Sequence, residues 1–384
     1  MPGKFPSVLA AAVMAAAALA APAAASASTC ADAPDTAVTP RAVFNDPVGG
    51  DAAAIVRTLC GMIRQTPAGA SIQVAHFVMS GADGTAFADE LLRAYRRGVD
   101  VRVVVDGDSR GQTVARRLAD VLGTDTATRS WLHVCTGPMS GGTAACIGDK
   151  GQHNKFYLFS RTGGASDVVV QSSANLTDLN SSTYWNNALV LPGNRRLYAT
   201  YDAYFADLAA ERKNLDYYRV VQTGAAGGAV RASFFPKADG DPIVEELDRV
   251  SCEGGATVRV GMSEWDTYRV AIAEKLRDLA GRGCTVRIVY GIMADDVRRL
   301  LQAEPRITLH VLGGGGALPG RLHSKYLLIE GPSNGHWVLT GSHNYNQTSL
   351  RRNDETLLKL NNKAIYQQYV KNFEHMREVA PPAS

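Results

Sequence analysis

The sequence predicts an α/β fold made of two homologous α/β/α sandwich halves, related by a pseudo-twofold axis, with the active site at their interface. Two observations support this prediction. The segments His153-Asn154-Lys155 and His323-Ser324-Lys325 are each followed, after a strand-like run, by a turn with the pattern S-x-N. The order of helix-like and strand-like segments around the two H-x-K copies is also the same. Together these observations indicate an internal duplication.

The first elements of each half follow the order helix, strand, helix and strand. Hydrophobic periodicity predicts them in the first half over residues 51–64, 71–78, 86–97 and 101–106. In the second half they fall on residues 243–250, 257–262, 270–282 and 286–290. Gly98 and Gly283 each follow an arginine at the end of the second helix, where glycine is a common C-cap.

Each half is predicted to close with a strand and a helix. The strands fall on residues 188–191 and 356–360, and the helices on residues 196–208 and 363–376. The two helices carry matching aromatic residues at helical spacing, which predicts core positions for Tyr201, Phe205, Tyr369 and Phe373. Residues 225–228 are typical of a linker, so we expect halves over residues 28–222 and 223–384.

Residues 1–27 are typical of a signal peptide. Lys4 precedes an apolar run over residues 8–21, and Ala25-Ser26-Ala27 fits a signal peptidase site. A membrane anchor is the alternative, but the run is short for a bilayer core of about 30 Å. We therefore expect a secreted, extracellular protein without a later membrane-spanning segment.

Six cysteines agree with export to an oxidising compartment. Their order along the chain favours three disulfides, which are Cys30 with Cys60, Cys135 with Cys146, and Cys252 with Cys284. A metal site is the alternative, but no C-x-x-C pattern with matching histidine spacing is present in the sequence. The second disulfide would staple a glycine-rich loop shortly before His153.

The composition is that of a globular chain without a strong polyanion-binding surface. The 384 residues are 46% hydrophobic and 20% charged, which allows a large core or two packed units. The net charge is only +3, and the sequence contains no long run of lysine and arginine. These values disfavour nucleic acid as the substrate.

The H-x-K pattern predicts a phosphate site with an acid and a base. Side chains two residues apart on a strand project from the same face, so His153 and Lys155 point together, as do His323 and Lys325. The lysines would offset the charge that makes a phosphodiester a poor target for nucleophiles. One neutral imidazole could attack phosphorus and form a phosphohistidine while the other protonates the departing alcohol. This reaction needs no metal and no cofactor, so neither is expected.

These residues resemble the signature of the phospholipase D superfamily, also called the HKD family, which is H-x-K-x4-D followed by G-S-x-N. The resemblance covers nearly the whole chain after the signal peptide. It implies that His153 is the nucleophile and His323 the general acid and base, although the reverse assignment stays open. It also implies that phosphate is bound by Lys155 and Lys325 and by the two turns through Ser173, Asn175, Ser342 and Asn344.

The departures from this signature concern acidic residues. Ser160 and Glu330 stand where the signature has aspartate, at the far end of the strand from each histidine, so we expect a structural role there. The family also uses a downstream acid to orient each histidine. Matching the closing strands assigns this role to Asn187 and Glu355, with Asn186 and Asp354 as the alternatives shifted by one residue.

The remaining histidines carry weaker signals. His76 ends a predicted strand and is assigned either to the rim of the pocket or to the core. His343 lies inside the second S-x-N turn and is a candidate for substrate contact. The others lack any repeated context and are expected to be structural, namely His133, His310, His336 and His375.

The first functional hypothesis is a secreted phospholipase D that acts on phospholipid at a membrane or micelle surface, with transfer of the phosphatidyl group to other alcohols as a further reaction. Glycine-rich loops over residues 136–143 and 313–320 carry Met139 and Leu318 as candidate interfacial contacts. One alternative is a secreted metal-independent nuclease of the same superfamily. Another is a catalytically inactive module that binds phosphate esters. Because one chain holds both half-sites, a monomer would suffice.

Overall fold

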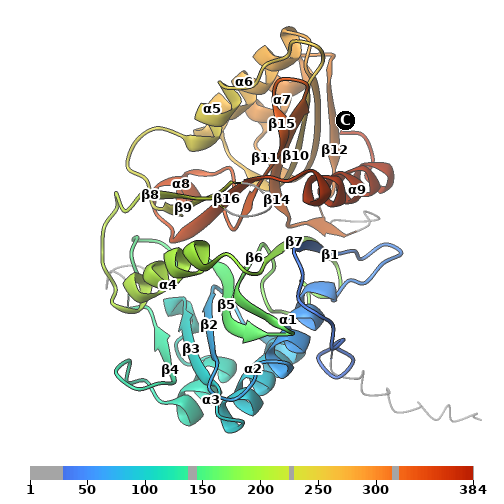
Figure 1. Cartoon of the computed structure of the whole chain (residues 1–384). Coiled ribbons are helices and arrows are strands. Elements are labelled where there is room, and N and C mark those ends of the chain that lie inside the picture. The colour runs from blue at the N-terminus through green and yellow to red at the C-terminus, as the bar shows by residue number, and fades with distance from the viewer. Residues whose placement is uncertain (1–28, 137–144, 225–228, 314–319, 384) are drawn as a thin grey trace, which may run out of the picture.

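The computed structural model describes residues 29–136, 145–224, 229–313 and 320–383. Over these residues the chain forms two mixed sheets, each 8-stranded. Figure 1 shows the N-terminal sheet with α1, α2 and α3 in the lower part of the molecule and the C-terminal sheet with α5, α6 and α7 in the upper part. The predicted fold class of two repeated α/β halves is confirmed.

The first sheet has the strand order β1-β7-β6-β5-β2-β3-β4, with β13 paired to β7. The strands β2, β3 and β4 at one end of this order are parallel, the pairs from β2 to β1 are antiparallel, and β13 is parallel to β7. The strands are β1 Arg41–Asn45, β2 Ser71–His76, β3 Asp100–Val105, β4 Trp131–Val134, β5 Lys155–Thr162, β6 Ala165–Ser172, β7 Tyr184–Leu191 and β13 Arg321–Leu322.

The second sheet repeats this plan in the order β12-β11-β10-β14-β15-β16-β9-β8. The parallel strands are again three consecutive strands at one end of the order, β10, β11 and β12. The strands are β8 Arg219–Thr223, β9 Val230–Phe235, β10 Thr257–Trp265, β11 Thr285–Met293, β12 Ile307–Val311, β14 Lys325–Gly331, β15 Gly335–Gly341 and β16 Glu355–Asn361.

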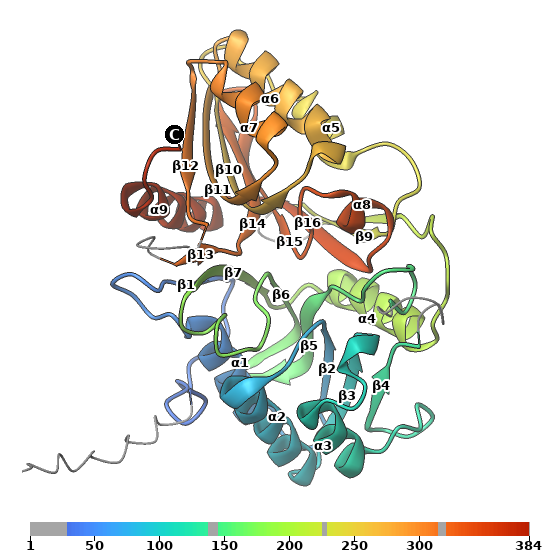
Figure 2. The same ribbon diagram turned by 180° about the vertical axis from the view of Figure 1, so that it is seen from behind.

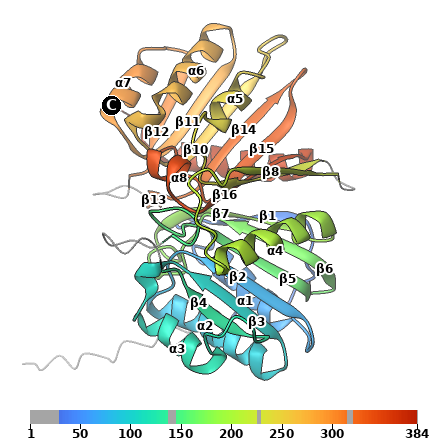
Figure 3. The same cartoon turned by 90° about the vertical axis from the view of Figure 1, so that its left-hand side faces the viewer.

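Helices cover the outer face of each sheet and also lie between the halves. The outer helices are α1 Ala54–Arg64, α2 Gly81–Arg96 and α3 Thr113–Leu122 on the first sheet, and α5 Pro242–Leu247, α6 Val270–Gly281 and α7 Asp295–Gln302 on the second. The inner helices are α4 Arg195–Ala209 and α9 Lys363–Val379. Short helices lie at η1 Gly107–Ser109, η2 Thr267–Arg269 and α8 Gln347–Arg351. Figure 3 shows the two sheets one above the other, with α4 on the lower half beneath β8.

The core explains why the two halves stay together. Each sheet packs its outer face against its own helices, and the inner faces share a third cluster with α4 and α9. The four aromatic residues predicted to be core, Tyr201, Phe205, Tyr369 and Phe373, all lie in this shared cluster. Their helices bury one apolar stripe, as the helical spacing required. The interface between the halves is therefore a continuous hydrophobic core.

The three predicted disulfides are confirmed, as Cys30–Cys60, Cys135–Cys146 and Cys252–Cys284. Among the described residues, none of the helices combines the length and the apolar character needed to cross a bilayer. The predicted signal peptide over residues 1–27, the linker at residues 225–228, and Met139 and Leu318 lie outside the described residues.

Candidate active site

Each H-x-K segment is held by the closing strand of the other half. The backbone N–H of His153 donates to the carbonyl of Asp354 at 3.0 Å. The N–H of His323 donates to the carbonyl of Trp185 at 2.8 Å. Figure 2 shows β13, which precedes His323 in the C-terminal half, beside β7 of the N-terminal half. The fold thus brings both histidines to the junction of the halves.

The histidines do not lie on regular strands as predicted. β5 begins at Lys155 and β14 at Lys325, and each histidine sits two residues earlier in an extended segment. The physical reason is that the N–H of each histidine pairs with the other half, so the ladder to the neighbouring strand begins only at the lysine. Each lysine Nζ then donates back to the carbonyl of its own histidine at 2.7 Å.

The orienting groups also come from the opposite half. His153 Nδ1 lies 2.8 Å from Glu355 Oε1, and the Glu355 side chain is fully buried. His323 Nδ1 lies 2.9 Å from Asn186 Oδ1, and this amide is buried as well. In both pairs the ring nitrogen that meets the partner is Nδ1, which leaves Nε2 as the nitrogen able to react at phosphorus or to transfer a proton.

The structure corrects the assignment of Asn187, because the closing strands match with a shift of one residue. Ser172 is paired with Ala188 in the first sheet, and Gly341 with Leu357 in the second, so Asn186 is the counterpart of Glu355. Asn187 is the next residue on the strand and faces the other way. Its Oδ1 accepts the N–H of Lys325 at 3.1 Å, and its Nδ2 donates to Thr340 and Tyr369. Counting from the serine of each S-x-N turn would have found Asn186, which follows Ser173 by the same number of residues as Glu355 follows Ser342.

Burial lowers the pKa of both lysines. Lys325 has a pKa of about 7, since desolvation and the charge of Arg321 outweigh the attraction of Glu264 and Glu355. The pKa of Lys155 lies well below its usual range, mainly through burial, with Lys325 adding to the effect. An anion between the two ammonium groups would raise both values, as expected of groups that bind phosphate.

The two histidines differ in their electrostatic surroundings. Burial lowers the pKa of His153, and the carboxylate of Glu355 opposes this effect. The pKa of His323 falls further, to well below its usual range, because burial is reinforced by the charges of Lys325 and Lys155. Burial alone would raise the pKa of Glu355, but His153 brings it down to about 2, so the group is a carboxylate at neutral pH. The lysine of each half therefore acts on the histidine of the other half, but only His153 has a carboxylate that opposes the effect.

In each S-x-N turn the serine hydroxyl has a hydrogen-bond partner, whereas the side-chain oxygen of the asparagine has none among the described residues. Ser173 Oγ donates to Asn186 Oδ1 at 3.1 Å, and Ser342 Oγ accepts the N–H of Thr356 at 3.2 Å. By contrast, the side-chain oxygens of Asn175 and Asn344 are buried and find no hydrogen-bond partner within the described residues. Buried polar atoms without partners are costly, and these oxygens could accept only from a donor on a ligand, whereas a phosphate oxygen would have to be bound by the amide N–H groups of the two asparagines.

The positions where the signature has aspartate are structural. Ser160 Oγ accepts the backbone N–H of Ser71 at 2.8 Å, which ties β5 to the start of β2. Glu330 forms an ion pair with Arg259 at 2.7 Å, near the end of β14 that lies away from the site. Neither residue contacts a catalytic histidine in the hydrogen bonds of the described chain, in agreement with the expected role.

Aromatic neighbours of the histidines were not found by sequence reasoning. The ring of Phe77 lies 4.8 Å from that of His153, and Lys155 Nζ lies 4.9 Å from the Phe77 centroid. On the other side, Tyr184 lies 5.8 Å from His323. Arg321 stacks on Tyr184 and forms an ion pair with Glu264 at 3.1 Å. The available signal was position alone, since Phe77 lies near the end of the strand predicted over residues 71–78 and Tyr184 lies shortly before the strand predicted over residues 188–191.

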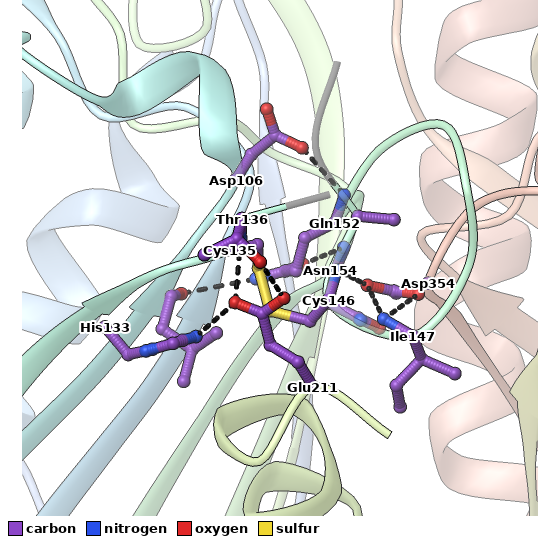
Figure 4. The surroundings of a disulfide bond; sticks show 12 residues. Asp106, His133, Cys135, Thr136, Cys146, Ile147, Gln152, Asn154, Glu211 and Asp354 are labelled. Carbon is purple, nitrogen blue, oxygen red and sulfur yellow. Dashed lines mark hydrogen bonds and ion pairs between the residues drawn. A yellow bond between two sulfur atoms is a disulfide. The ribbon is translucent and has the colours of Figure 1, made fainter. Parts of the chain in front are cut away.

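Asp354 does not contact a histidine ring but holds the segment that leads to His153. Its carboxylate accepts the backbone N–H groups of Cys146 at 2.7 Å, Ile147 at 3.1 Å and Gly148 at 2.6 Å. Figure 4 shows this carboxylate beside the Cys135–Cys146 disulfide, while Glu211 receives hydrogen bonds from Thr136 at the other end of the closed loop. Glu211, Asp354 and the disulfide thereby hold Thr136 and residues 146–148 in place.

The other histidines have defined partners. His76 is fully buried, with Nδ1 3.1 Å from Tyr157 Oη and Nε2 accepting the N–H of Leu176, so it belongs to the core beneath the first S-x-N turn. Four further histidines are in agreement with the structural role expected for them. Each contacts Glu211, a carbonyl or an aromatic ring away from the site, and the four are His133, His310, His336 and His375. Within the described ranges, no cluster of three or more His, Cys, Asp or Glu could hold a metal ion.

Comparisons with known proteins agree with this geometry. Residues 59–209 and 252–377 match the family model described as "Cardiolipin synthase, PLD-like domain". A search of the curated proteins found no match. The solved structure of phosphatidylserine synthase from Haemophilus influenzae Rd KW20 has a TM-score of 0.65 at 13% identity and covers 89% of this chain and 87% of that one. Polyphosphate kinase from Porphyromonas gingivalis has a TM-score of 0.57 at 14% identity, covering 88% of this chain and 50% of the kinase. At these identities the likeness shows a shared fold.

Proposed function

The chain belongs to the phospholipase D superfamily, and from this premise we propose that it is a secreted phosphodiesterase that hydrolyses the head-group phosphodiester bond of phospholipids. In this proposal the N-terminal half, residues 28–222, supplies His153 and the C-terminal half, residues 223–384, supplies His323. The observation that carries the proposal is the pair of crossed contacts, in which each histidine is oriented by a buried residue of the opposite half. Two imidazoles and two lysines at one junction suit a single phosphorus atom.

In the first step, His153 Nε2 attacks phosphorus and the bond to the head-group oxygen breaks. The imidazole becomes positively charged as the nitrogen–phosphorus bond forms, and the Glu355 carboxylate on Nδ1 stabilises that charge. This argument favours His153 over His323 as nucleophile, because His323 meets a neutral amide instead. The imidazolium of His323, protonated when the anionic substrate binds, gives its proton to the leaving alcohol.

In the second step, His323 accepts a proton from water, and the resulting hydroxide attacks phosphorus. The nitrogen–phosphorus bond breaks, which releases a phosphate monoester and restores neutral His153. An alcohol in place of water would accept the phosphatidyl group and give transfer. Lys155 and Lys325 are proposed to hold the non-bridging oxygens, since both lysines are buried beside the histidines. The Nδ2–H groups of Asn175 and Asn344, in the two S-x-N turns, are proposed to donate to the same oxygens.

Secretion forms part of the proposal. The three disulfides fit an oxidising compartment, and the N-terminal residues are typical of an export signal. The substrate is proposed to be phospholipid at a membrane or micelle surface, because the small net charge gives little attraction to a nucleic acid. A monomer would be sufficient, since both half-sites lie in one chain.

The test is an assay of the purified mature chain with EDTA against phosphatidylcholine and phosphatidylethanolamine in mixed micelles and against single- and double-stranded DNA. Release of choline or ethanolamine, with activity retained in EDTA, is expected. Cleavage of DNA without release of a head group would instead identify a nuclease. Binding of phosphate esters without cleavage of any diester would identify an inactive binding module.

A further inference from the structure

Three partly exposed side chains gather beside His323, and we call them the outer cluster. They are Tyr184, Glu264 and Arg321. Arg321 lies two residues before His323 and forms an ion pair with Glu264 at 3.1 Å. Its guanidinium lies 5.6 Å from the centre of the Tyr184 ring, which in turn lies 5.8 Å from the His323 ring. The outer cluster is therefore an accessible surface next to the proposed general acid, and the two-histidine mechanism uses none of its members.

The backbone places Glu264 beside the second H-x-K segment. Ser263, the residue before it, donates its N–H to the carbonyl of Ser324 at 3.0 Å. Burial lowers the pKa of Lys325, and the charge of Glu264 opposes this effect more strongly than that of Glu355 does. A charge acts strongly only over a short distance, so the Glu264 carboxylate lies close enough to Lys325 to belong to the electrostatic environment of the site.

The duplicated plan gives each member of the outer cluster a counterpart beside His153, and none of the counterparts carries a charge. Matching the halves at their histidines, lysine-bearing strands and orienting residues gives the counterparts of Arg321, Glu264 and Tyr184, which are Gly151, Val78 and Asn353. Asn353 is buried and donates to Glu355 at 3.1 Å, so it is committed to an internal partner. At these positions an ion pair and an aromatic ring therefore occur only on the side of the general acid.

Two other polar residues near the second S-x-N turn are directed into the protein. Arg269 is 1% exposed, forms an ion pair with Asp241 at 2.7 Å and lies 3.1 Å from Nδ1 of His343. His343 is 2% exposed, and burial and the charge of Arg269 lower its pKa to about 3, so its ring is neutral at physiological pH. A buried, neutral ring beside Arg269 supports the turn from inside, so the outer cluster is the better candidate for contact with a head group.

Glu264 keeps one carboxylate oxygen for a ligand. Its Oε1 takes Arg321, whereas its Oε2 receives, within the described residues, a contact of 3.5 Å from Asn346 Nδ2, which is long for a hydrogen bond. A carboxylate has about four acceptor sites, and the Glu264 side chain is 39% exposed. The ring of Tyr184, by contrast, already has the guanidinium of Arg321 over it. The outer cluster therefore favours a cation that donates hydrogen bonds to a carboxylate over one that needs the face of an aromatic ring.

We propose that Glu264 is a specificity-determining residue that binds the ammonium group of the leaving alcohol, so that the site prefers an ethanolamine head group to a choline head group. This inference rests on the proposed function, in which His323 gives its proton to the head-group oxygen and the head group therefore lies beside the outer cluster. A primary ammonium has three N–H donors for Glu264, whereas the quaternary ammonium of choline has none. Arg321 holds Glu264 in place and covers the ring of Tyr184, which choline would otherwise use.

The experiment compares kcat/KM for phosphatidylethanolamine and phosphatidylcholine with the same acyl chains in the same mixed micelles. The ratio of the two values cancels any effect of a variant on micelle binding or on the chemical step that both substrates share. The unchanged protein should prefer ethanolamine by about 5- to 10-fold, and Glu264→Gln should bring the ratio to within about twofold of one. Glu274→Gln is the matched control and should leave the ratio unchanged, because it makes the same substitution at an exposed position on the outer helix α6.

Binding gives a second measurement that does not require turnover. Calorimetric titration with phosphoethanolamine and phosphocholine should show tighter binding of phosphoethanolamine, by a similar factor, and Glu264→Gln should remove the difference. Thermal unfolding would establish that each variant is folded. Equal values for the two head groups in the unchanged protein overturn the proposal, as does a preference for ethanolamine that persists in folded Glu264→Gln. If the unchanged protein cleaves no diester, the proposed function fails while the binding comparison still decides this inference.

Discussion

The two half-sites share one backbone scheme but differ in the side chains around their histidines. In both, the histidine N–H donates to the carbonyl that precedes the orienting residue of the opposite half. The group that meets Nδ1 is a carboxylate for His153 and an amide for His323. Main-chain hydrogen bonds do not depend on residue type, so a duplicated fold can keep its geometry while its chemistry diverges. The difference assigns the two histidines different tasks.

The largest expected effect comes from removing each histidine and varying the leaving group. His153→Ala should abolish cleavage of both a choline ester and a p-nitrophenyl ester, because the nucleophile is lost for either substrate. His323→Ala should lose about 10²- to 10⁴-fold on the choline ester, the usual contribution of a general acid. The first-turnover burst of p-nitrophenolate should be nearly unaffected, since that leaving group needs no proton, although later turnovers should be slow. The measurement is burst kinetics with both substrates.

The intermediate should accumulate on one histidine in the same experiment. His323→Ala lacks the base that activates water, so phosphorus is expected to remain on residue 153, where peptide mass spectrometry would detect it. The control is Ser160→Ala, at the position that only ties β5 to β2. Phosphorus found on residue 323 in His153→Ala would reverse the assignment of roles.

The next prediction concerns the two orienting residues, Glu355 and Asn186, whose exchange should shift the pKa of the two histidines in opposite directions. Glu355→Gln makes the first half-site resemble the second, so the pKa of His153 should fall and the acid limb of kcat/KM should move to lower pH. The rate should also fall by about 10- to 100-fold because the charge on the phosphohistidine is no longer stabilised. Asn186→Asp makes the second half-site resemble the first, so the pKa of His323 should rise and the alkaline limb should move to higher pH. Equal shifts in both variants would show that the half-sites are interchangeable.

The sequence was sufficient for the parts of this comparison that depend on repetition. The H-x-K pairs, the fold class and the core aromatics Tyr201 and Tyr369 follow from patterns within one half that recur in the other, whereas the disulfide pairs follow from the order of the cysteines along the chain. Helical and strand periodicities report which face is buried, and those faces form the shared core.

The parts that depend on contact between the halves were not available from the sequence. Asn187 was chosen over Asn186 because strand ends are poorly defined in sequence, and a shift of one residue turns a side chain to the opposite face. The hydrogen bond between Glu355 and His153 joins the two halves, so it depends on how the sheets face each other. No local sequence pattern indicates that arrangement. Phe77 and Tyr184 lie beside the histidines for the same reason.

A smaller effect should separate the two lysines. Burial lowers the pKa of both lysines, and that of Lys325 is about 7, so Lys325 loses its proton near neutral pH. The inhibition constant of inorganic phosphate should therefore rise above pH 7, by up to about tenfold for each pH unit. Lys325→Met should bind phosphate more weakly and lack this break. The measurement is competitive inhibition at several pH values, and a break that persists in Lys325→Met would assign it elsewhere.

The smallest expected effect concerns the hydrogen bonds that hold the two H-x-K segments in place. The segment before His153 is held by the Asp354 carboxylate on three successive backbone N–H groups, whereas the segment before His323 is held by the pairing of β13 with β7. Asp354→Asn turns an amide N–H toward these donors and should cost about 1–3 kcal/mol of the free energy of unfolding. Asp149→Asn is the control, because its ion pair with Arg352 is exposed and should be worth about 1 kcal/mol or less. Denaturant unfolding measures the loss of unfolding free energy in both variants. Equal losses in Asp354→Asn and Asp149→Asn would mean that the Asp354 carboxylate adds no stability beyond what the backbone pairing provides in the other half.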